Sequence, residues 1–315
     1  MNCLKEMISG AKTVAIAGHV RPDGDCIGSC LGLYNYIKEN FSGVEAVVYL
    51  EKPSKVFDFL KGIDSICYDY EKEMEYDVFF ALDCGDRERL GKAVTYFDTA
   101  NHTICIDHHI SNQGFAQENY IKGELSSTCE FLCEFMEQDK ISVEAAKCLY
   151  TGIAHDTGVF QYSNTTSKTL NTVGMLIDKG FDFTKIIDET FYQKTYKQKQ
   201  ITGRALLESI MVLNGKVIFS AVHGKDMEFY GVTPGDLDGI VSQLRTTEGV
   251  EVAIFLYEIE PQVYKVSMRS NQYVNVSQIA SYFGGGGHIR AAGCTMQGSM
   301  HDVINNLTEH IEKQM

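Results

Sequence analysis

The residues of this sequence that could do chemistry are aspartates and histidines gathered in four short clusters. They lie in HVRPDGD (19–25), ALD (81–83), IDHHIS (106–111) and AHDTG (154–158), and their candidate residues are His19, Asp23, Asp25, Asp83, Asp107, His108, His109, His155 and Asp156. Carboxylates and imidazoles without thiolates suit manganese or magnesium better than a structural zinc ion. Their number is enough for two ions that share a carboxylate, and such a pair can assist phosphoester hydrolysis by water.

Each cluster alone has a simpler structural explanation. An aspartate at a strand end commonly caps a helix or forms a turn, and a histidine beside a core strand is commonly a structural residue. About five carboxylates gathered at one place would, however, repel one another unless cations neutralised them. The four clusters taken together therefore predict a dinuclear metal centre.

The elements that must position these clusters are apolar runs that alternate with helical patterns. Strands are predicted at 13–18, 44–50, 77–83 and 102–107, and a helix is predicted at 27–40. Near-continuous apolar strands that alternate with helices are typical of a parallel sheet covered by helices on both faces, an α/β fold. Ligands of such sheets bind beyond the carboxyl ends of the strands, which is where we expect the clusters to meet.

The pattern changes after a mainly helical region at 126–191. A polar, lysine-bearing stretch at 192–209 is predicted to be a connecting helix, and alternating strands follow it. The final helix, predicted at 302–313, carries Val303, Leu307 and Ile311 on one face. We therefore predict a first domain at 1–191, a linker at 192–209 and a smaller α+β domain at 210–315.

Composition limits the class of substrate. The chain has 315 residues, 44% of them hydrophobic, and a formal net charge of −14. A surface this acidic is unsuited to long nucleic acids, so a nucleic-acid substrate is expected to be short. The ten cysteines contain no C-x-x-C pair and are expected to be reduced. With neither a signal peptide nor a membrane span in the pattern, we expect a cytoplasmic location and no membrane partner.

At this point the sequence resembles a known family. The four clusters, in this order, resemble the motifs of the DHH phosphoesterases, and GGGGHIRAAG (284–293) resembles the DHHA1 domain associated with them. The resemblance covers nearly the whole chain. It implies two divalent ions, with Mn²⁺ expected and Mg²⁺ as the alternative. One ion would be bound by His19, Asp23 and Asp83. The other would be bound by four residues, including Asp83 again as the bridge: Asp25, Asp83, His108 and Asp156.

The resemblance also implies roles beyond the metal ligands. Asp107 would orient the histidines, and His109 would face the reacting phosphoryl group. His155 departs from the family pattern, which often has a small residue there, and a structural role is favoured over substrate contact. Substrate would be bound in a cleft between the two domains, by residues of the second domain: Arg269, the glycine loop Gly285, Gly286 and Gly287, and His288, with Arg290 adding charge. Arg87 could reach the same site or form a salt bridge.

The members that this chain resembles most hydrolyse very short oligoribonucleotides to mononucleotides and dephosphorylate 3′-phosphoadenosine 5′-phosphate (pAp). The expected partners are therefore short RNA, pAp or pApA, with a homodimer as one alternative for the oligomeric state. The main functional alternative is a cyclic di-AMP or pApA phosphodiesterase. Further alternatives are a RecJ-like single-strand exonuclease and a catalytically silent nucleotide-binding protein, although the second would be expected to have lost ligands that this chain retains.

Overall fold

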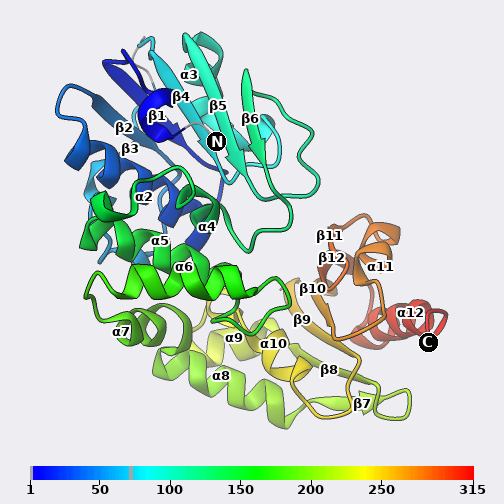
Figure 1. Ribbon diagram of the computed structural model, residues 1–315. Coiled ribbons are helices and arrows are strands. Elements are labelled where there is room, and N and C mark those ends of the chain that lie inside the picture. Colours follow the sequence, from blue (N-terminus) through cyan, green and yellow to red (C-terminus); the bar gives the residue numbers. More distant parts are fainter. Residues whose placement is uncertain (1–2, 71–73) are drawn as a thin grey trace. The chain divides into compact units, whose positions relative to one another are not determined.

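The computed structural model describes residues 3–70 and 74–315 and is shown in Figure 1. The chain divides into two compact units, Met1–Gln193 and Lys194–Met315. Within the stretch 192–209 lies helix α8 (Tyr196–Leu207), which belongs to the second unit. None of the helices in the described parts of the chain is long and apolar enough to cross a membrane.

The first unit contains a six-stranded parallel sheet with the strand order β3-β2-β1-β4-β5-β6. Its strands are β1 (Thr13–Ala17), β2 (Glu45–Tyr49), β3 (Ile66–Cys67), β4 (Val78–Leu82), β5 (His102–Asp107) and β6 (Glu118–Ile121). The predicted parallel sheet is confirmed. The two edge strands β3 and β6 were not predicted, because β3 has two residues and β6 is a polar, half-exposed segment without an apolar run.

Helices cover both faces of this sheet because alternate side chains of each central strand point to opposite faces. One face packs Ile16, Phe80 and Ile104 against α2 (Gly24–Asn40) and α5 (Val143–Asp156). The opposite face packs Ala15, Phe79 and Cys105 against aromatic residues of α3 (Val94–Thr99). The other helices of the unit are α1 (Leu4–Met7), α4 (Thr128–Leu132), α6 (Ser167–Ile177) and α7 (Phe183–Ile187). Short 3₁₀ segments lie at Lys55–Phe57, Ile63–Ser65, Glu88–Ala93 and Gln138–Lys140, and a π-helical turn lies at Asp188–Tyr192.

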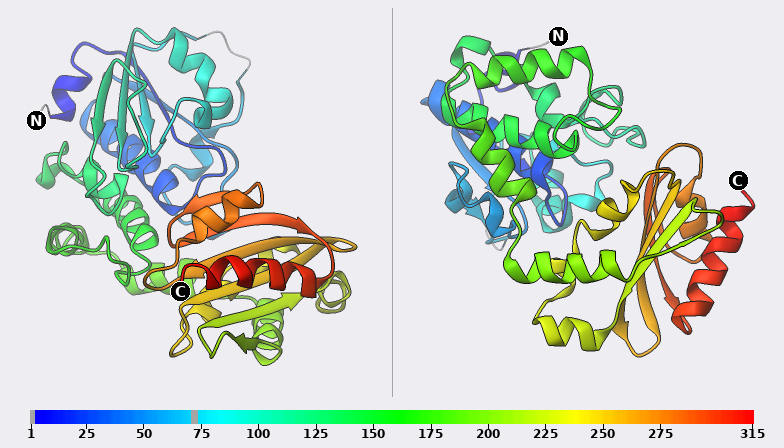
Figure 2. Two further views of the ribbon diagram at one scale, coloured as in Figure 1. Left: turned by 90° about the vertical axis from the view of Figure 1, so that its right-hand side faces the viewer. Right: turned by 90° about the horizontal axis from the view of Figure 1, so that it is seen from below.

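The second unit is a mixed sheet with the order β11-β12-β10-β9-β8-β7. Its strands are β7 (Ile210–Val212), β8 (Val217–Val222), β9 (Val252–Glu260), β10 (Val263–Ser270), β11 (Gly286–His288) and β12 (Ala291–Gln297). Its remaining helices are α9 (Gly224–Tyr230), α10 (Ile240–Arg245), α11 (Val276–Tyr282) and α12 (Met300–Glu312), with a 3₁₀ segment at Pro234–Leu237. Helix α12 lies across the sheet (Figure 2, left) and buries Val303, Leu307 and Ile311 as predicted. The predicted α+β class of this unit is confirmed.

The glycine-rich segment is more ordered than the predicted loop. Gly286 to His288 form the edge strand β11, which pairs antiparallel with β12. A Cβ atom on Gly285 would lie 2.2 Å from the carbonyl oxygen of Gly293, and one on Gly287 would lie 2.5 Å from that of Ala291. Gly287 also has a φ of 144°, which L side chains rarely adopt. The glycines are therefore required for the close approach of β11 to β12.

Candidate metal centre

The structure brings the four polar clusters together at one edge of the parallel sheet. Strands β1, β4 and β5 are neighbours and parallel, so the residues that follow their carboxyl ends meet. The fourth cluster reaches the same place because Asp156 is the last residue of α5, which packs against α2. Three groups of donor atoms each lie within 4.8 Å of one another: His19, Cys26 and Asp83; Asp83, His108 and His109; and Asp25, His108 and Asp156.

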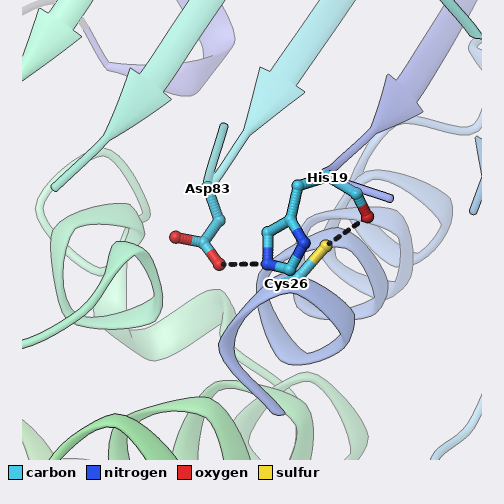
Figure 3. A group of neighbouring side chains, drawn as sticks. All are labelled: His19, Cys26 and Asp83. Carbon is cyan, nitrogen blue, oxygen red and sulfur yellow. Dashed lines mark hydrogen bonds and ion pairs between the residues drawn. The ribbon is translucent and has the colours of Figure 1, made fainter. Parts of the chain in front are cut away.

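Asp83 lies between two histidines. Its Oδ2 atom is 3.5 Å from Nε2 of His19, and its Oδ1 atom is 3.5 Å from Nε2 of His108. Figure 3 shows the side chains of Asp83 and His19 pointing toward each other from the ends of two strands. Asp83 adopts a left-handed backbone conformation with φ 53°, which aspartate tolerates better than most residues, and it follows β4 directly. One carboxylate thus faces two imidazoles with different oxygen atoms.

Two backbone segments fix the carboxylates of α2. Asp23 is the N-cap of α2, and its Oδ1 accepts hydrogen bonds from the backbone N–H groups of Asp25 and Cys26 while lying 3.7 Å from Nε2 of His19. Asp25 is buried and accepts hydrogen bonds from the backbone N–H groups of Thr128 (2.7 Å) and Cys129 (3.0 Å) at the start of α4. Both carboxylates are therefore held in fixed positions by backbone donors.

Glycines allow α5 to approach α2 closely enough to complete the cluster. A Cβ atom on Gly152 of α5 would lie 2.8 Å from Oδ1 of Asp25 and 2.2 Å from Sγ of Cys129. A Cβ atom on Gly28 of α2 would lie 2.5 Å from the carbonyl oxygen of Cys148. This approach brings Asp156 Oδ2 to 3.1 Å from Nε2 of His108.

The two adjacent histidines have different partners. His109 Nδ1 lies 2.7 Å from Oδ1 of Asp107, whose Oδ2 accepts a 2.7 Å hydrogen bond from the side-chain amide of Asn112. His108 Nδ1 instead faces the carbonyl oxygen of Leu125 at 3.4 Å. Asp107 was predicted to orient both histidines. In the structure the carboxylate of Asp107 is hydrogen-bonded to His109, whereas His108 faces the carbonyl oxygen of Leu125. Backbone geometry explains this, because consecutive side chains leave the end of a strand in different directions.

The electrostatics of the cluster fit a site for cations. Burial, together with the charges of Asp83 and Asp156, raises the pKa of Asp25 well above its usual value. Burial also raises the pKa of Asp156, against the effect of His108. Burial lowers the pKa of His19, but the nearby carboxylates of Asp23 and Asp83 outweigh this effect and raise it to about 11. Buried carboxylates that repel one another are stabilised by positive charge, which bound cations would supply.

The distances in the cluster also fit shared metal ions. Two ligand atoms about 2.1 Å from one ion lie about 3.0 Å apart when they subtend a right angle. The separations of 3.1 Å between His108 and Asp156, and of 3.5 Å on each side of Asp83, are near this value. Separations of 3.5 Å between nitrogen and oxygen are longer than ordinary hydrogen bonds. The donor set of carboxylates and imidazoles therefore fits divalent cations.

His155 has a structural environment. Its Nε2 lies 2.8 Å from the hydroxyl oxygen of Thr190, which itself donates to the carbonyl oxygen of Ile186, so Nε2 carries the hydrogen of this bond. The ring packs against Phe57 and Phe191 with centroids 5.3 and 5.8 Å away. A Cβ atom on Gly24 would lie 2.5 Å from Cγ of His155. These contacts support the structural role that the sequence favoured.

Two residues that lie near the centre were not among the predicted site residues. Cys26 is buried with its sulfur near His19 and its S–H directed at the His19 carbonyl oxygen, 3.8 Å away (Figure 3). Burial raises the pKa of its thiol well above the usual value, so the thiol is neutral. Thr128 donates its hydroxyl to Oδ1 of Asp83 at 3.2 Å. No spacing rule links residue 128 to residue 83, so only the fold reveals this contact.

The predicted substrate residues lie in the second unit. Arg269 of β10 and His288 of β11 each pair with Ala291 of β12, one on either side, so the three residues form one row across the sheet. Directly paired residues of antiparallel strands have their side chains on the same face of the sheet. Arg269 and His288 lie two strands apart, so their backbones are separated by about 10 Å. Arg290 donates a hydrogen bond to the carbonyl oxygen of Val274.

In the first unit, Arg87 forms a two-point salt bridge with Asp98. Of the two alternatives that the sequence left open for Arg87, substrate contact or a salt bridge, the structure contains the salt bridge.

Comparison with known proteins gives matches over both units. The family model "DHH family, N-terminal domain" matches residues 13–153, and "DHHA1 domain" matches residues 214–315. A bifunctional oligoribonuclease and PAP phosphatase NrnA of Thermus thermophilus is 31% identical over an alignment of 288 positions, which covers 90% of this chain and 84% of that protein.

Two further matches differ in how much of the other protein they cover. The crystal structure of an exopolyphosphatase-related protein from Bacteroides fragilis has a TM-score of 0.90 and 26% sequence identity, covering 98% of this chain and 94% of that one. The cyclic-di-AMP phosphodiesterase GdpP of Bacillus subtilis is 23% identical over an alignment of 330 positions, which covers 99% of this chain but 49% of that protein.

Proposed function

Because this chain belongs to the DHH phosphoesterase family, whose members are hydrolases acting on phosphoester bonds, we propose that it hydrolyses very short oligoribonucleotides and dephosphorylates pAp. The observation that carries this proposal is the position of Asp83, whose two carboxylate oxygens face His19 and His108 within a buried acidic cluster. Such an arrangement suits a bridging ligand between two cations.

In this proposal His19, Asp23 and Asp83 would hold one divalent ion. Asp83 would also serve the second ion, which would be held by three further residues: Asp25, His108 and Asp156. When bound, the two ions would supply Lewis-acid activation of water and would neutralise charge on the phosphoryl oxygens. Mn²⁺ is proposed because the donors are carboxylates and imidazoles, and Mg²⁺ is the alternative.

The protein's own residues would then position the reacting group. Asp107 fixes the imidazole of His109 through Nδ1, and Asn112 fixes Asp107 in turn. The opposite nitrogen of His109, Nε2, would interact with a phosphoryl oxygen. Buried backbone donors from α4 hold Asp25 still, so the carboxylates need little reorganisation during the reaction.

Recognition of the rest of the substrate is assigned to the second unit. Arg269 and His288, in one row across the sheet, would bind a terminal phosphate and the adjoining nucleotide, and the backbone of Gly285, Gly286 and Gly287 would allow close approach. The net charge of −14 supports short substrates rather than long nucleic acid. The relative named for oligoribonuclease and PAP phosphatase activities is similar over most of both chains, which supports this choice over cyclic di-AMP or pApA.

A substrate panel tests the proposal. Purified protein with Mn²⁺ is offered pAp, RNA of two to five nucleotides, pApA, cyclic di-AMP and long single-stranded DNA, and initial rates are compared with those of the protein kept in a chelator. The proposal expects pAp and the short RNAs to have the highest kcat/KM. A preference for cyclic di-AMP would favour the alternative, and a preference for long DNA would contradict the proposal.

A further inference from the structure

We propose that a tyrosine-lined pocket beside His19 is a binding subsite for one nucleobase of the substrate. This inference rests on the proposed function, because it assigns the base next to the scissile phosphate. The pocket has a volume of about 190 Å³ and is formed entirely by the first unit. Its lining includes the candidate metal ligand His19, three tyrosines, Glu51 and Lys92.

Sheet topology explains why the pocket adjoins the metal centre. The strand order β3-β2-β1-β4-β5 puts β1 between two groups of strands. The metal cluster lies beyond β1, β4 and β5, whereas the pocket lies beyond β1, β2 and β3, where Tyr49, Glu51 and Tyr68 line it. His19, at the end of β1, belongs to both. A nucleoside attached to a phosphate at the metal cluster can therefore reach the pocket on the β2 side.

The aromatic wall of the pocket suits a planar ring. Tyr70 is backed by Tyr49 at a centroid distance of 5.6 Å, and Tyr49 in turn stacks on Tyr96 at 4.6 Å. The Tyr49 hydroxyl is hydrogen-bonded to that of Tyr76 at 2.6 Å, which holds this wall rigid. Tyr68, by contrast, is 51% exposed, so its ring is available for stacking. Stacking on aromatic side chains is the common way in which proteins bind single-stranded bases.

Charged groups at the rim match the rest of a nucleotide. The Lys92 ammonium lies 5.9 Å from the centre of the Tyr70 ring and can meet a phosphate. Glu51 accepts a 2.7 Å hydrogen bond from the backbone N–H of Arg21, which fixes its carboxylate at the pocket. A carboxylate accepts hydrogen bonds from exocyclic amino groups such as those of adenine and cytosine. Tyr68, Tyr70 and Lys92 also line a neighbouring hollow of about 390 Å³, through which the substrate can continue.

The size of the pocket indicates a subsite and not a complete ligand site. Sites that enclose a whole drug-sized ligand are commonly about 300–1,000 Å³. A volume of about 190 Å³ suits one ring system, with the sugar and phosphate outside. The pocket therefore selects for a base on one side of the scissile phosphate, and a baseless phosphoester cannot use it.

A fluorescence experiment tests base binding independently of catalysis. The sequence contains no tryptophan, so a Tyr68→Trp variant has a single tryptophan whose emission reports on the pocket. In Mg²⁺ buffer, AMP should quench this emission and ribose 5-phosphate should not. Phe59→Trp is the matched control, because Phe59 is 37% exposed in the same unit and does not line the pocket. Equal responses to both probes, or equal quenching in the control, would overturn the proposal.

Kinetics with the full-length enzyme then separate the subsite from the proposed function. The substrates are the dinucleotide ApA and its two abasic analogues, which lack one base or the other. Tyr68→Ala should raise KM for ApA by about 5-fold or more while leaving one abasic analogue unaffected, whereas Phe59→Ala should behave like the wild type. Equal losses on ApA and on both analogues would overturn the subsite but not the function. A wild type that hydrolyses no dinucleotide would overturn the proposed function, and the fluorescence result would still decide on the subsite.

Discussion

The Oδ1 atom of Asp107 lies 2.7 Å from Nδ1 of His109, two residues further along the chain. Asp107 is fully buried at the end of β5, whereas the side chain of His109 is 22% exposed. This hydrogen bond therefore anchors the partly exposed imidazole of His109, which a substrate could contact, to a buried residue at the end of a strand. The pKa of Asp107 is lowered, because its hydrogen bonds and the charge of His109 outweigh the opposing effect of burial.

Replacing Asp107 should impair turnover without removing metal. Asp107→Asn keeps the shape of the side chain but loses the charge that holds His109, so kcat should fall about 10–100-fold. The bound Mn²⁺, measured by elemental analysis, should be unchanged. Asp98→Asn is the control, because Asp98 pairs with Arg87 on the surface and should retain wild-type kcat. Loss of metal in Asp107→Asn would instead make Asp107 part of the metal site.

The contact between α5 and α2 should tolerate no added methyl group at Gly152. Gly152→Ala would place a Cβ atom 2.2 Å from Sγ of Cys129 and 2.8 Å from Oδ1 of Asp25. The expected cost is about 1–3 kcal/mol of unfolding free energy, with weaker Mn²⁺ binding because Asp25 is displaced. Chemical denaturation and metal titration measure the two effects.

Gly174→Ala is the matched helical control for this prediction. Gly174 lies within α6, and apart from its chain neighbours and the backbone of its own helix, a Cβ atom there would meet no heavy atom within 4 Å. This variant should be more stable than the wild type, by up to about 1 kcal/mol, because alanine favours helix. If Gly152→Ala were equally stabilising, the close packing of α5 on α2 would be refuted.

Loss of the His155 ring should affect stability more than catalysis. His155→Ala removes the hydrogen bond to Thr190 and the packing against Phe57, so we expect a destabilisation of about 2–3 kcal/mol. With saturating Mn²⁺ at a temperature where the variant is folded, kcat should stay within about 3-fold of wild type. An unchanged melting temperature combined with a large loss of kcat would show that His155 contacts substrate.

Glu134 should make stability depend on pH in the acid range. Burial raises its pKa, but hydrogen bonds to Lys122 and Lys168 outweigh this and lower it. A lowered pKa in the folded state stabilises the protein above the unfolded pKa, about 4.3 for glutamate, and this stabilisation is lost as pH falls through the folded value. Glu134→Gln should therefore reduce the urea midpoint at pH 7 more than at pH 3. An equal reduction at both pH values would contradict the ion-pair explanation.

Much of the first unit could be predicted from the sequence because its strands are continuous apolar runs. The predicted strand at 102–107 has the bounds of β5, and the rule for parallel sheets correctly gathered clusters that are far apart in the chain. The edge strand β6 could not be predicted, since half-exposed residues such as Glu118 and Asn119 carry no apolar pattern. Strand β11 was missed for a different reason: its glycines resemble a loop, and their need for close contact with β12 appears only in three dimensions.

Within the candidate centre, the residue types and their order were predictable, but the contacts that hold them were not. The backbone N–H groups of Thr128 and Cys129 bind Asp25 across about a hundred residues of sequence, and they are backbone atoms that no residue type reveals. The tyrosine pocket could likewise not be predicted from the sequence, because Tyr49 and Tyr68 come together only through the order of strands β2 and β3.

The most direct test of the shared-carboxylate centre is the number of Mn²⁺ ions bound per chain by Asp83→Asn, with its rate of pAp hydrolysis measured in parallel. Asparagine tolerates the left-handed backbone at φ 53°, so the fold should be preserved, and circular dichroism checks this. We predict two ions per wild-type chain, at most one in the variant, and a fall in kcat of about 100-fold or more. A folded variant that binds two ions and hydrolyses pAp at the wild-type rate would contradict the role of Asp83 as the bridge.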